Sequence, residues 1–249
     1  MKRLLLFLSA LFIATTAIAH TINWYVDGSV YYTTTCESGE NVTPPTAPEK
    51  YGYTFRMWET YTQIEYLEST KTQYIDTHYK PNAETTVEIE AQFLNINKLS
   101  WVFGSRPSSN SNIFALAVNP SINQYIFGYN KSIGNNITPH PVPDTEKHIF
   151  KLDKGICSID DETIFSYNQT AFQSENNLYL FANNDERDFY SNSNARIFKC
   201  LIYDNNILIR DFIPVLDNNG VPCMYDKVEN KFYYNAGTGD FIAGPIIGE

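Results

Sequence analysis

The sequence predicts an all-β protein built of two packed antiparallel sheets. Aromatic residues make up 15% of the 249 residues, and aromatic side chains fit the pleated, half-buried surface of a sheet. No segment repeats apolar residues at the spacing of an amphipathic helix. Short apolar runs are instead broken repeatedly by Asn, Gly, Pro and Ser, which is typical of a β-sandwich or β-barrel.

Residues 1–19 predict a secretory signal peptide. A basic pair opens the chain, residues 4–13 form an apolar run, and residues 17–19 match a small-x-small cleavage pattern. The alternative is a retained membrane anchor, but the apolar run is short for a bilayer span. We therefore expect a mature chain that begins at His20, has no membrane span, and is secreted or held in the cell envelope.

The charge of the chain argues against two classes of partner. The formal net charge is −10, and it becomes −12 when the basic pair of the signal peptide is removed. No cluster of Lys and Arg is visible. Nucleic acid and anionic membrane surfaces both require concentrated positive charge, so we expect neither as a partner.

Residues 20–60 predict a small β module. Two strand-like runs, 22–26 and 30–35, flank Asp27-Gly28, which is a strong hairpin turn signal. The proline segment "TPPTAP" follows and is expected to be stiff and extended. A module this short buries little surface by itself.

This stretch resembles the Listeria–Bacteroides repeat, the B-repeat of internalin-like bacterial surface proteins. The resemblance lies in the strand pair, the proline segment and "GYTFRMW", where Met57 stands in place of the usual Gly. It implies a single copy of a β-grasp-like extracellular spacer or adhesion element.

Ten or more further strands are expected within residues 61–249. In residues 85–93, apolar residues at every second position alternate with Glu and Gln, which indicates a strand with one buried face. Residues 177–183 are apolar on both faces, so we expect them to form a central, buried strand. Further strands are expected at 101–105, 113–118, 124–129, two within 148–167 with turns near 153–155 and 160–161, 196–204, 207–215, 223–226 and 231–235.

The segment 203–220 carries two Asp/Asn clusters that invite interpretation as a metal cage. We interpret Asn205-Asn206 as a two-residue turn between strands, because Asn tolerates the positive φ angles that such a turn needs. Pro214 is expected near the end of its strand. Arg210 is expected to contact a carboxylate or carbonyl elsewhere in the fold.

Three segments resemble the concanavalin A-like, laminin-G-type jelly-roll domains of secreted and phage-associated bacterial proteins. They are "YLESTKTQYIDTHYKP" from residue 66, "LYLFANN" from residue 178, and the stretch 196–241. The resemblance implies two curved antiparallel sheets, often glycan or surface binding, and in some branches a calcium ion at the rim.

Glycosidases of this superfold use two carboxylates on one strand, and retention of configuration requires them about 5–5.5 Å apart. Glu88 and Glu90 share a strand face, but the central Asp of the pattern is absent, and Glu84 precedes the strand. We interpret Glu88 and Glu90 as a solvated strand face, with a catalytic pair as the alternative.

The histidines give no indication of a nucleophilic triad. A triad needs a base beside its nucleophile, and no GxSxG elbow is present. His140 lies in a proline-rich loop and His148 begins a strand, so we interpret both as surface residues.

Calcium is the only cofactor that the sequence suggests. Asn183, Asp185 and Asp188 place oxygen-bearing side chains directly after the expected central strand, and Ca²⁺ prefers such ligands. The same residue types are ordinary turn formers, and we favour that interpretation both here and at 217–220.

Aromatic side chains suggest sugar contacts, because sugar rings commonly stack on them. The candidates are Trp101, Tyr125, Tyr129 and Tyr190. The alternative is packing between the sheets, which we favour for Trp101 and hold about equal for Tyr129 and Tyr190.

The mature chain has four cysteines without CxxC spacing, so a zinc site is not indicated. Export would permit disulfides, and four cysteines allow three full pairings. Cys200 and Cys223 are the candidate pair, with two buried free thiols as the alternative.

These observations predict a non-catalytic, surface-exposed binding or adhesion protein whose partner is a glycan or another cell-surface ligand. One alternative is a glycoside hydrolase or lyase of the same superfold. The other is a structural envelope or spacer protein.

Overall fold

The computed structural model describes residues 19–26, 29–37, 40, 42–52, 61–107, 111–132, 141–168, 170–185 and 193–247. The chain divides into two compact units, residues 1–58 and 59–249. The described residues contain no helix, and therefore none long and apolar enough to cross a membrane. The expected signal peptide lies outside the described residues, except for Ala19.

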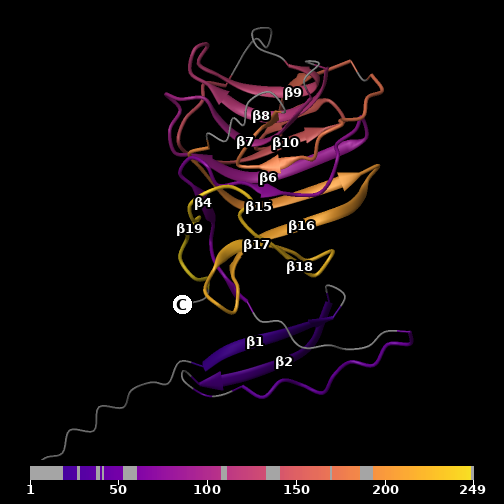
Figure 1. The fold of residues 1–249 in the computed structure, drawn as a ribbon, viewed down its shortest axis with the longest axis vertical. Coiled ribbons are helices and arrows are strands. Elements are labelled where there is room, and N and C mark those ends of the chain that lie inside the picture. The colour runs from indigo at the N-terminus through magenta and orange to yellow at the C-terminus, as the bar shows by residue number, and fades with distance from the viewer. Residues whose placement is uncertain are drawn as a thin grey trace, which may run out of the picture. The chain divides into compact units, whose positions relative to one another are not determined.

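The first unit contains an antiparallel hairpin of β1 (Ala19–Val26) and β2 (Ser29–Glu37) (Figure 1). The two strands predicted from 22–26 and 30–35 are confirmed. Trp24 is buried, and its indole N–H donates to Thr34 Oγ1 at 3.4 Å. The expected turn at residues 27–28 and the "YTFRMW" run at 53–58 lie outside the described residues.

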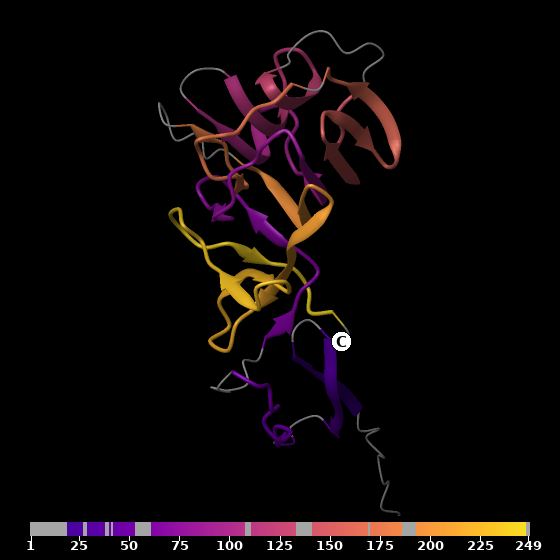
Figure 2. The ribbon, with the colours of Figure 1, turned by 90° about the vertical axis from the view of Figure 1, so that its right-hand side faces the viewer.

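The second unit contains two sheets, of which the larger has eleven strands. Its main path runs β12-β11-β10-β6-β15-β16-β17-β18, with β4 paired to β15 and β19, and β3 paired to β16. Figure 2 shows β16–β18, orange to yellow, at the opposite end of this sheet from the salmon-coloured β10–β12. The strands are β3 (Thr62–Gln63), β4 (Leu67–Ser69), β6 (Thr85–Phe93), β10 (Lys147–Asp153), β11 (Ile156–Ile159), β12 (Glu162–Ser166), β15 (Ala195–Asp204), β16 (Ile207–Leu216), β17 (Pro222–Asp226), β18 (Lys231–Tyr233) and β19 (Ile242–Ala243).

The smaller sheet has six strands in the order β5-β13-β7-β8-β9, and β14 also pairs with β7. The described strand pairings are antiparallel except for β7–β14, which is parallel. The strands are β5 (Ile75–Asp76), β7 (Ser100–Arg106), β8 (Ser111–Asn119), β9 (Gln124–Ser132), β13 (Tyr179–Leu180) and β14 (Asn184–Asp185).

Both sheets contribute to one apolar core, which confirms the predicted all-β, two-sheet fold. Val87, Ile89, Ala91 and Phe93 of β6 are all at most 1% exposed, so the alternation in the sequence identified the buried face correctly. The smaller sheet adds Phe114, Leu116 and Phe127, among others. Burial of each large apolar side chain stabilises the fold by about 1.5–3 kcal/mol.

The segment 203–220 is a hairpin with a turn at each end, as predicted. Asn205 and Asn206 have φ angles of 47° and 65° and form the two-residue turn between β15 and β16. Pro214 lies two residues before the end of β16, beyond the last residue of β16 that pairs with β15. Asp217 accepts backbone N–H bonds from Asn219 and Val221, so the second cluster is a turn as well.

The predicted strand at 177–183 is central and buried but much shorter than expected. Only Tyr179–Leu180 pair as β13, between β5 and β7. Phe181 has a φ of 63°, which is uncommon for a bulky residue and ends the extended conformation. The apolar run in residues 178–182 predicted a strand. Nothing in the sequence predicted the break in the backbone at Phe181.

The candidate disulfide between Cys200 and Cys223 does not form, and both residues are buried free thiols, which was the alternative. All four cysteines are free. Cys200 lies on β15 in the main core, whereas Cys223 lies on β17 in a second cluster with Ile213 and Val215. Strand β16 separates β15 from β17, and Cys200 pairs with Phe212 whereas Cys223 pairs with Val215. The two Cα atoms are therefore more than two strand spacings, or more than roughly 10 Å, apart, which is too far for a disulfide.

Candidate functional site

The predicted carboxylate pair lies on the face of β6 that points away from the core. Glu90 Oε1 is 2.6 Å from Lys147 Nζ, and Glu88 Oε2 is 3.4 Å from Lys151 Nζ. Both lysines belong to β10, the neighbouring strand. Each carboxylate is therefore balanced across the sheet by its own lysine, which fits the interpretation of a solvated strand face.

Three of the four predicted sugar-stacking aromatics are buried. Tyr125 is 5% exposed and packs against Phe150, with ring centroids 5.2 Å apart. Tyr129 is 1% exposed, and its hydroxyl donates to Ala83 O at 2.8 Å. Burial raises the pKa of Tyr125 to about 12. The stacking role predicted for these two residues is therefore wrong, because the face they share turned out to be the core face.

Trp101 lies in a separate buried cluster on the other face of the smaller sheet. It is 8% exposed and packs with Ile113, Ala117 and Ile126. A ring buried in this way cannot stack on a sugar, which confirms the interpretation favoured for Trp101, packing in the core. Tyr190 lies outside the described residues.

The predicted calcium ligands do not form a cluster of free oxygens. Asn183 is 1% exposed, and neither atom of its amide has a hydrogen-bond partner. Asp185 is also buried, and its Oδ2 is 3.7 Å from Arg106 Nε, so a positive charge already neighbours it. Asp188 lies outside the described residues. Within the described part of the chain, no three His, Cys, Asp or Glu residues are grouped so that they could hold a metal ion.

His148 is held between two carboxylates. Its Nδ1 is 2.6 Å from Asp160 Oδ2, and its Nε2 is 3.0 Å from Asp144 Oδ1. Burial lowers the pKa of His148, but the hydrogen bonds to Asp160 and Asp144 outweigh it, and the net effect is a raised pKa. Both ring nitrogens are thus occupied by acidic partners, which does not suit a general base for a serine.

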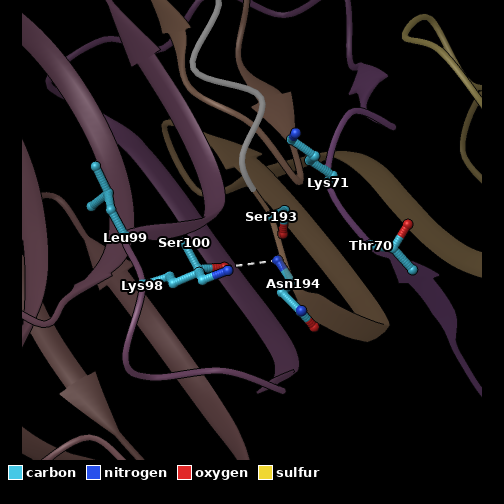
Figure 3. A pocket seen from close by; sticks show the side chains of 7 residues that line it. All are labelled: Thr70, Lys71, Lys98, Leu99, Ser100, Ser193 and Asn194. Atoms are coloured by element: carbon cyan, nitrogen blue, oxygen red, sulfur yellow. Dashed lines mark hydrogen bonds between the residues drawn. The ribbon is translucent and has the colours of Figure 1, made fainter.

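The best candidate for a ligand site is an open pocket of about 480 Å³ (Figure 3). Its walls come from three segments that are far apart in sequence: the end of β4, the start of β7 with the residues before it, and the residues before β15. The lining residues are Thr70, Lys71, Lys98, Leu99, Ser100, Ser193 and Asn194.

Hydrogen bonds hold the segment that carries Lys71. The side-chain carbonyl of Gln73 accepts from the backbone N–H of Thr70 at 3.1 Å and of Lys71 at 3.2 Å. Gln73 itself is 5% exposed and donates to Asp240 O at 3.0 Å. The backbone N–H of Ser193 donates to Lys71 O at 3.3 Å. This wall of the pocket is therefore fixed before any ligand arrives.

The opposite wall is fixed in the same way. Ser100 Oγ accepts from the backbone N–H of Asn194 at 2.9 Å, and Asn194 O accepts from Leu94 at 2.8 Å (Figure 3). An Asx turn, in which Asn97 donates to Asn95 Oδ1 at 2.9 Å, shapes the segment before Lys98. Both lysines thus extend from ordered loops at strand ends.

The pocket offers hydrogen-bond donors and positive charge. Lys71 and Lys98 are exposed and form no ion pair within the described residues, and the described lining residues include no carboxylate. Ser193 is 1% exposed, and its hydroxyl has no hydrogen-bond partner. A buried hydroxyl left unpaired costs about 1–3 kcal/mol. The pocket can therefore bind a polar ligand rich in oxygen acceptors.

None of these pocket residues stood out in the sequence. Lys71 and Lys98 are isolated lysines in "STKTQ" and "NKLS", and Ser193 lies far beyond both. The one available signal was that Lys98 and Ser193 each lie just before an expected strand. Comparison of the chain with protein-family models and with curated proteins gives no match.

Proposed function

We propose that the chain is an exported, non-catalytic binding protein that recognises glycans at the cell surface through the pocket around Lys71 and Lys98. The observation that carries the proposal is the pocket itself. Its volume of about 480 Å³ lies in the range typical of small-ligand sites. Hydroxyl, amide and ammonium groups lie around it together with apolar surface that includes Leu99, and a sugar presents both hydroxyls and apolar ring faces.

Two further observations support this function. The resemblance to laminin-G-type domains and to the B-repeat implies an extracellular, surface-acting protein. The carboxylates that a hydrolase would need, Glu88 and Glu90, are ion-paired to lysines on a sheet face and do not line the pocket. Binding therefore fits the described residues better than hydrolysis.

The test is a glycan array followed by titration calorimetry with the purified protein. Thr70→Trp places an indole at the exposed lip of the pocket. Ile207→Trp is the matched control, because Ile207 is 67% exposed and lies at the opposite end of β15 from Asn194. We expect Thr70→Trp to abolish binding and Ile207→Trp to leave it unchanged. An array without any hit, or binding that survives Thr70→Trp, would contradict the proposal.

A further inference from the structure

We infer that the pocket holds the anionic group of an acidic glycan, a carboxylate or a sulfate, between Lys71 and Lys98. This inference rests on the proposed function and names the ligand class of the same site. It starts from the charge of the pocket. The chain has a net charge of −10, yet the described residues that line the pocket include two lysines and no carboxylate.

Lys71 and Lys98 differ from other lysines in that both line the same pocket. Lys147, Lys151 and Lys227 each have a carboxylate oxygen within 3.4 Å, whereas Lys71 and Lys98, like Lys199 and Lys231, form no ion pair within the described residues. Glu68, the carboxylate nearest to Lys71 in sequence, pairs with Arg196 at 2.7 Å. Lys98 is flanked by Asn97 and Leu99, and Figure 3 shows the two lysines entering from different sides of the Ser193–Asn194 segment.

Uncompensated charge in a concave site attracts counter-charge from the solvent. A neutral sugar would leave both ammonium groups solvated and unused. An oxyanion on the sugar would supply counter-charge to both, and the Asn194 side chain would remain for sugar oxygens. The ligand that uses every group of the pocket is therefore an acidic sugar.

Lysine does not select strongly between oxyanions. Its ammonium group acts as a compact point charge, whereas the planar fork of Arg matches carboxylate and phosphate geometry in two-point contacts. We therefore name the shared chemistry, an oxyanion on a sugar ring, and let the experiment separate uronic acids from sulfated sugars. Nucleic acid does not fit, because two lysines in a chain of this charge make no extended basic surface.

The experiment compares three oligosaccharides of equal length: an oligouronate, a sulfated oligosaccharide and a neutral oligosaccharide. Titration calorimetry at about 20 mM and 300 mM NaCl measures each affinity, and inorganic sulfate is titrated as a free anion. We expect at least one acidic oligosaccharide to bind about tenfold more tightly than the neutral one at low salt, with the difference shrinking at high salt as screening increases.

The variant Lys71→Met/Lys98→Met should remove this preference and leave weak binding that no longer depends on charge. Lys80→Met/Lys199→Met is the control, because it makes the same change in net charge at two exposed lysines outside the pocket. If the control lost the preference for acidic oligosaccharides to the same extent, the inference would be overturned, since long-range attraction by the net charge would then explain the preference. Inorganic sulfate that binds as tightly as the sulfated oligosaccharide would also overturn it.

Failure of the inference can be told apart from failure of the proposed function. Equal binding of neutral and acidic oligosaccharides, blocked by Thr70→Trp and unaffected by the lysine variant, would sink the inference and leave the proposed function standing. Absence of binding to all three oligosaccharides would remove both.

Discussion

Arg210 provides a stringent test of how the C-terminal strands are held, because its guanidinium group lies at the centre of a buried network. Its side chain is 11% exposed, with Nη1 2.7 Å from Glu229 Oε1 and Nε 3.6 Å from Asp226 Oδ2. Arg210 also donates to the backbone carbonyls of Thr77 at 3.3 Å and Ile209 at 2.7 Å. These contacts confirm the prediction that Arg210 binds a carboxylate or carbonyl elsewhere in the fold.

Replacement by methionine, Arg210→Met, should destabilise the protein by about 3–5 kcal/mol. Asp226 is fully buried, and removal of one partner of a buried ion pair leaves an uncompensated charge of that cost. The control Lys147→Met breaks the more exposed pair with Glu90, whose side chains are 47% and 31% exposed, and should cost at most about 1 kcal/mol.

Urea unfolding of the purified variants, followed by tryptophan fluorescence, measures the difference. With a denaturant slope of about 2 kcal/mol per molar, Arg210→Met should lower the midpoint by about 1.5–2.5 M and Lys147→Met by no more than about 0.5 M. Equal shifts for the two variants would refute the claim that Asp226 depends on Arg210 for compensation.

The pH dependence of the same variant supplies a second check. Burial raises the pKa of Asp226 and outweighs the backbone N–H bonds from Asp211 and Val228 and the attraction of Arg210, all of which lower it. The folded state therefore binds this proton more readily than the unfolded state, and stability falls as pH rises above the unfolded value of 3.8. Without Arg210, the fall of stability with rising pH should be larger. The free energy of unfolding that Arg210→Met loses relative to the unmodified protein should therefore be greater at pH 7 than at pH 4.

Three further outcomes are expected. His148→Asn should flatten the dependence of stability on pH above pH 6.5. The pKa of His148 is raised in the folded protein, so the stability that it contributes is fully present below its unfolded pKa and is lost as pH rises through its folded pKa. Melting temperatures at pH 6 and 8 measure this difference. Gly237→Ala should lower the free energy of unfolding in urea by more than about 2 kcal/mol, because the added Cβ would lie 1.9 Å from Thr72 O. Gly220→Ala should lower it by about 1 kcal/mol, because the added Cβ meets open space and only the φ of +77° is unfavourable. Only Cys36, the one partly exposed cysteine, should react rapidly with a thiol reagent before denaturation; fast labelling of a second thiol would contradict the buried placement of the others.

Local signals explain the parts of the fold that the sequence predicted well. Alternation along β6 and the positive φ of Asn205 and Asn206 depend on a few adjacent residues, so pattern alone was sufficient. Alternation shows which residues share a face but not which face lies inside. Tyr125 and Tyr129 therefore remained candidates for sugar contacts beside the alternative of core packing, and the structure places both in the core.

The pocket could not be predicted, because its residues become neighbours only through the sheet topology. Lys71 belongs to a loop after β4, and Lys98 to a loop before β7. Pairing of β4 with β15 brings Lys71 beside Ser193, whose N–H binds the carbonyl of Lys71. No local pattern marks such a meeting, since each segment alone has the composition of an ordinary turn.

The pairing of lysines with carboxylates differs between the face of the larger sheet and the pocket. Lys147 and Lys151 of β10 pair with Glu90 and Glu88 of β6, so the neighbouring strand balances the positive charge of both lysines. Pairing is not confined to strands, since Lys154 and Lys227 lie just beyond strand ends and pair with Glu84 and Asp211. Lys71 and Lys98 lie in loops after β4 and before β7, and neither forms an ion pair within the described residues. Hydrogen bonds to the Gln73 side chain and from the Ser193 N–H hold the backbone of Lys71. The proposed oxyanion would therefore supply the counter-charge that the described carboxylates do not give these two lysines.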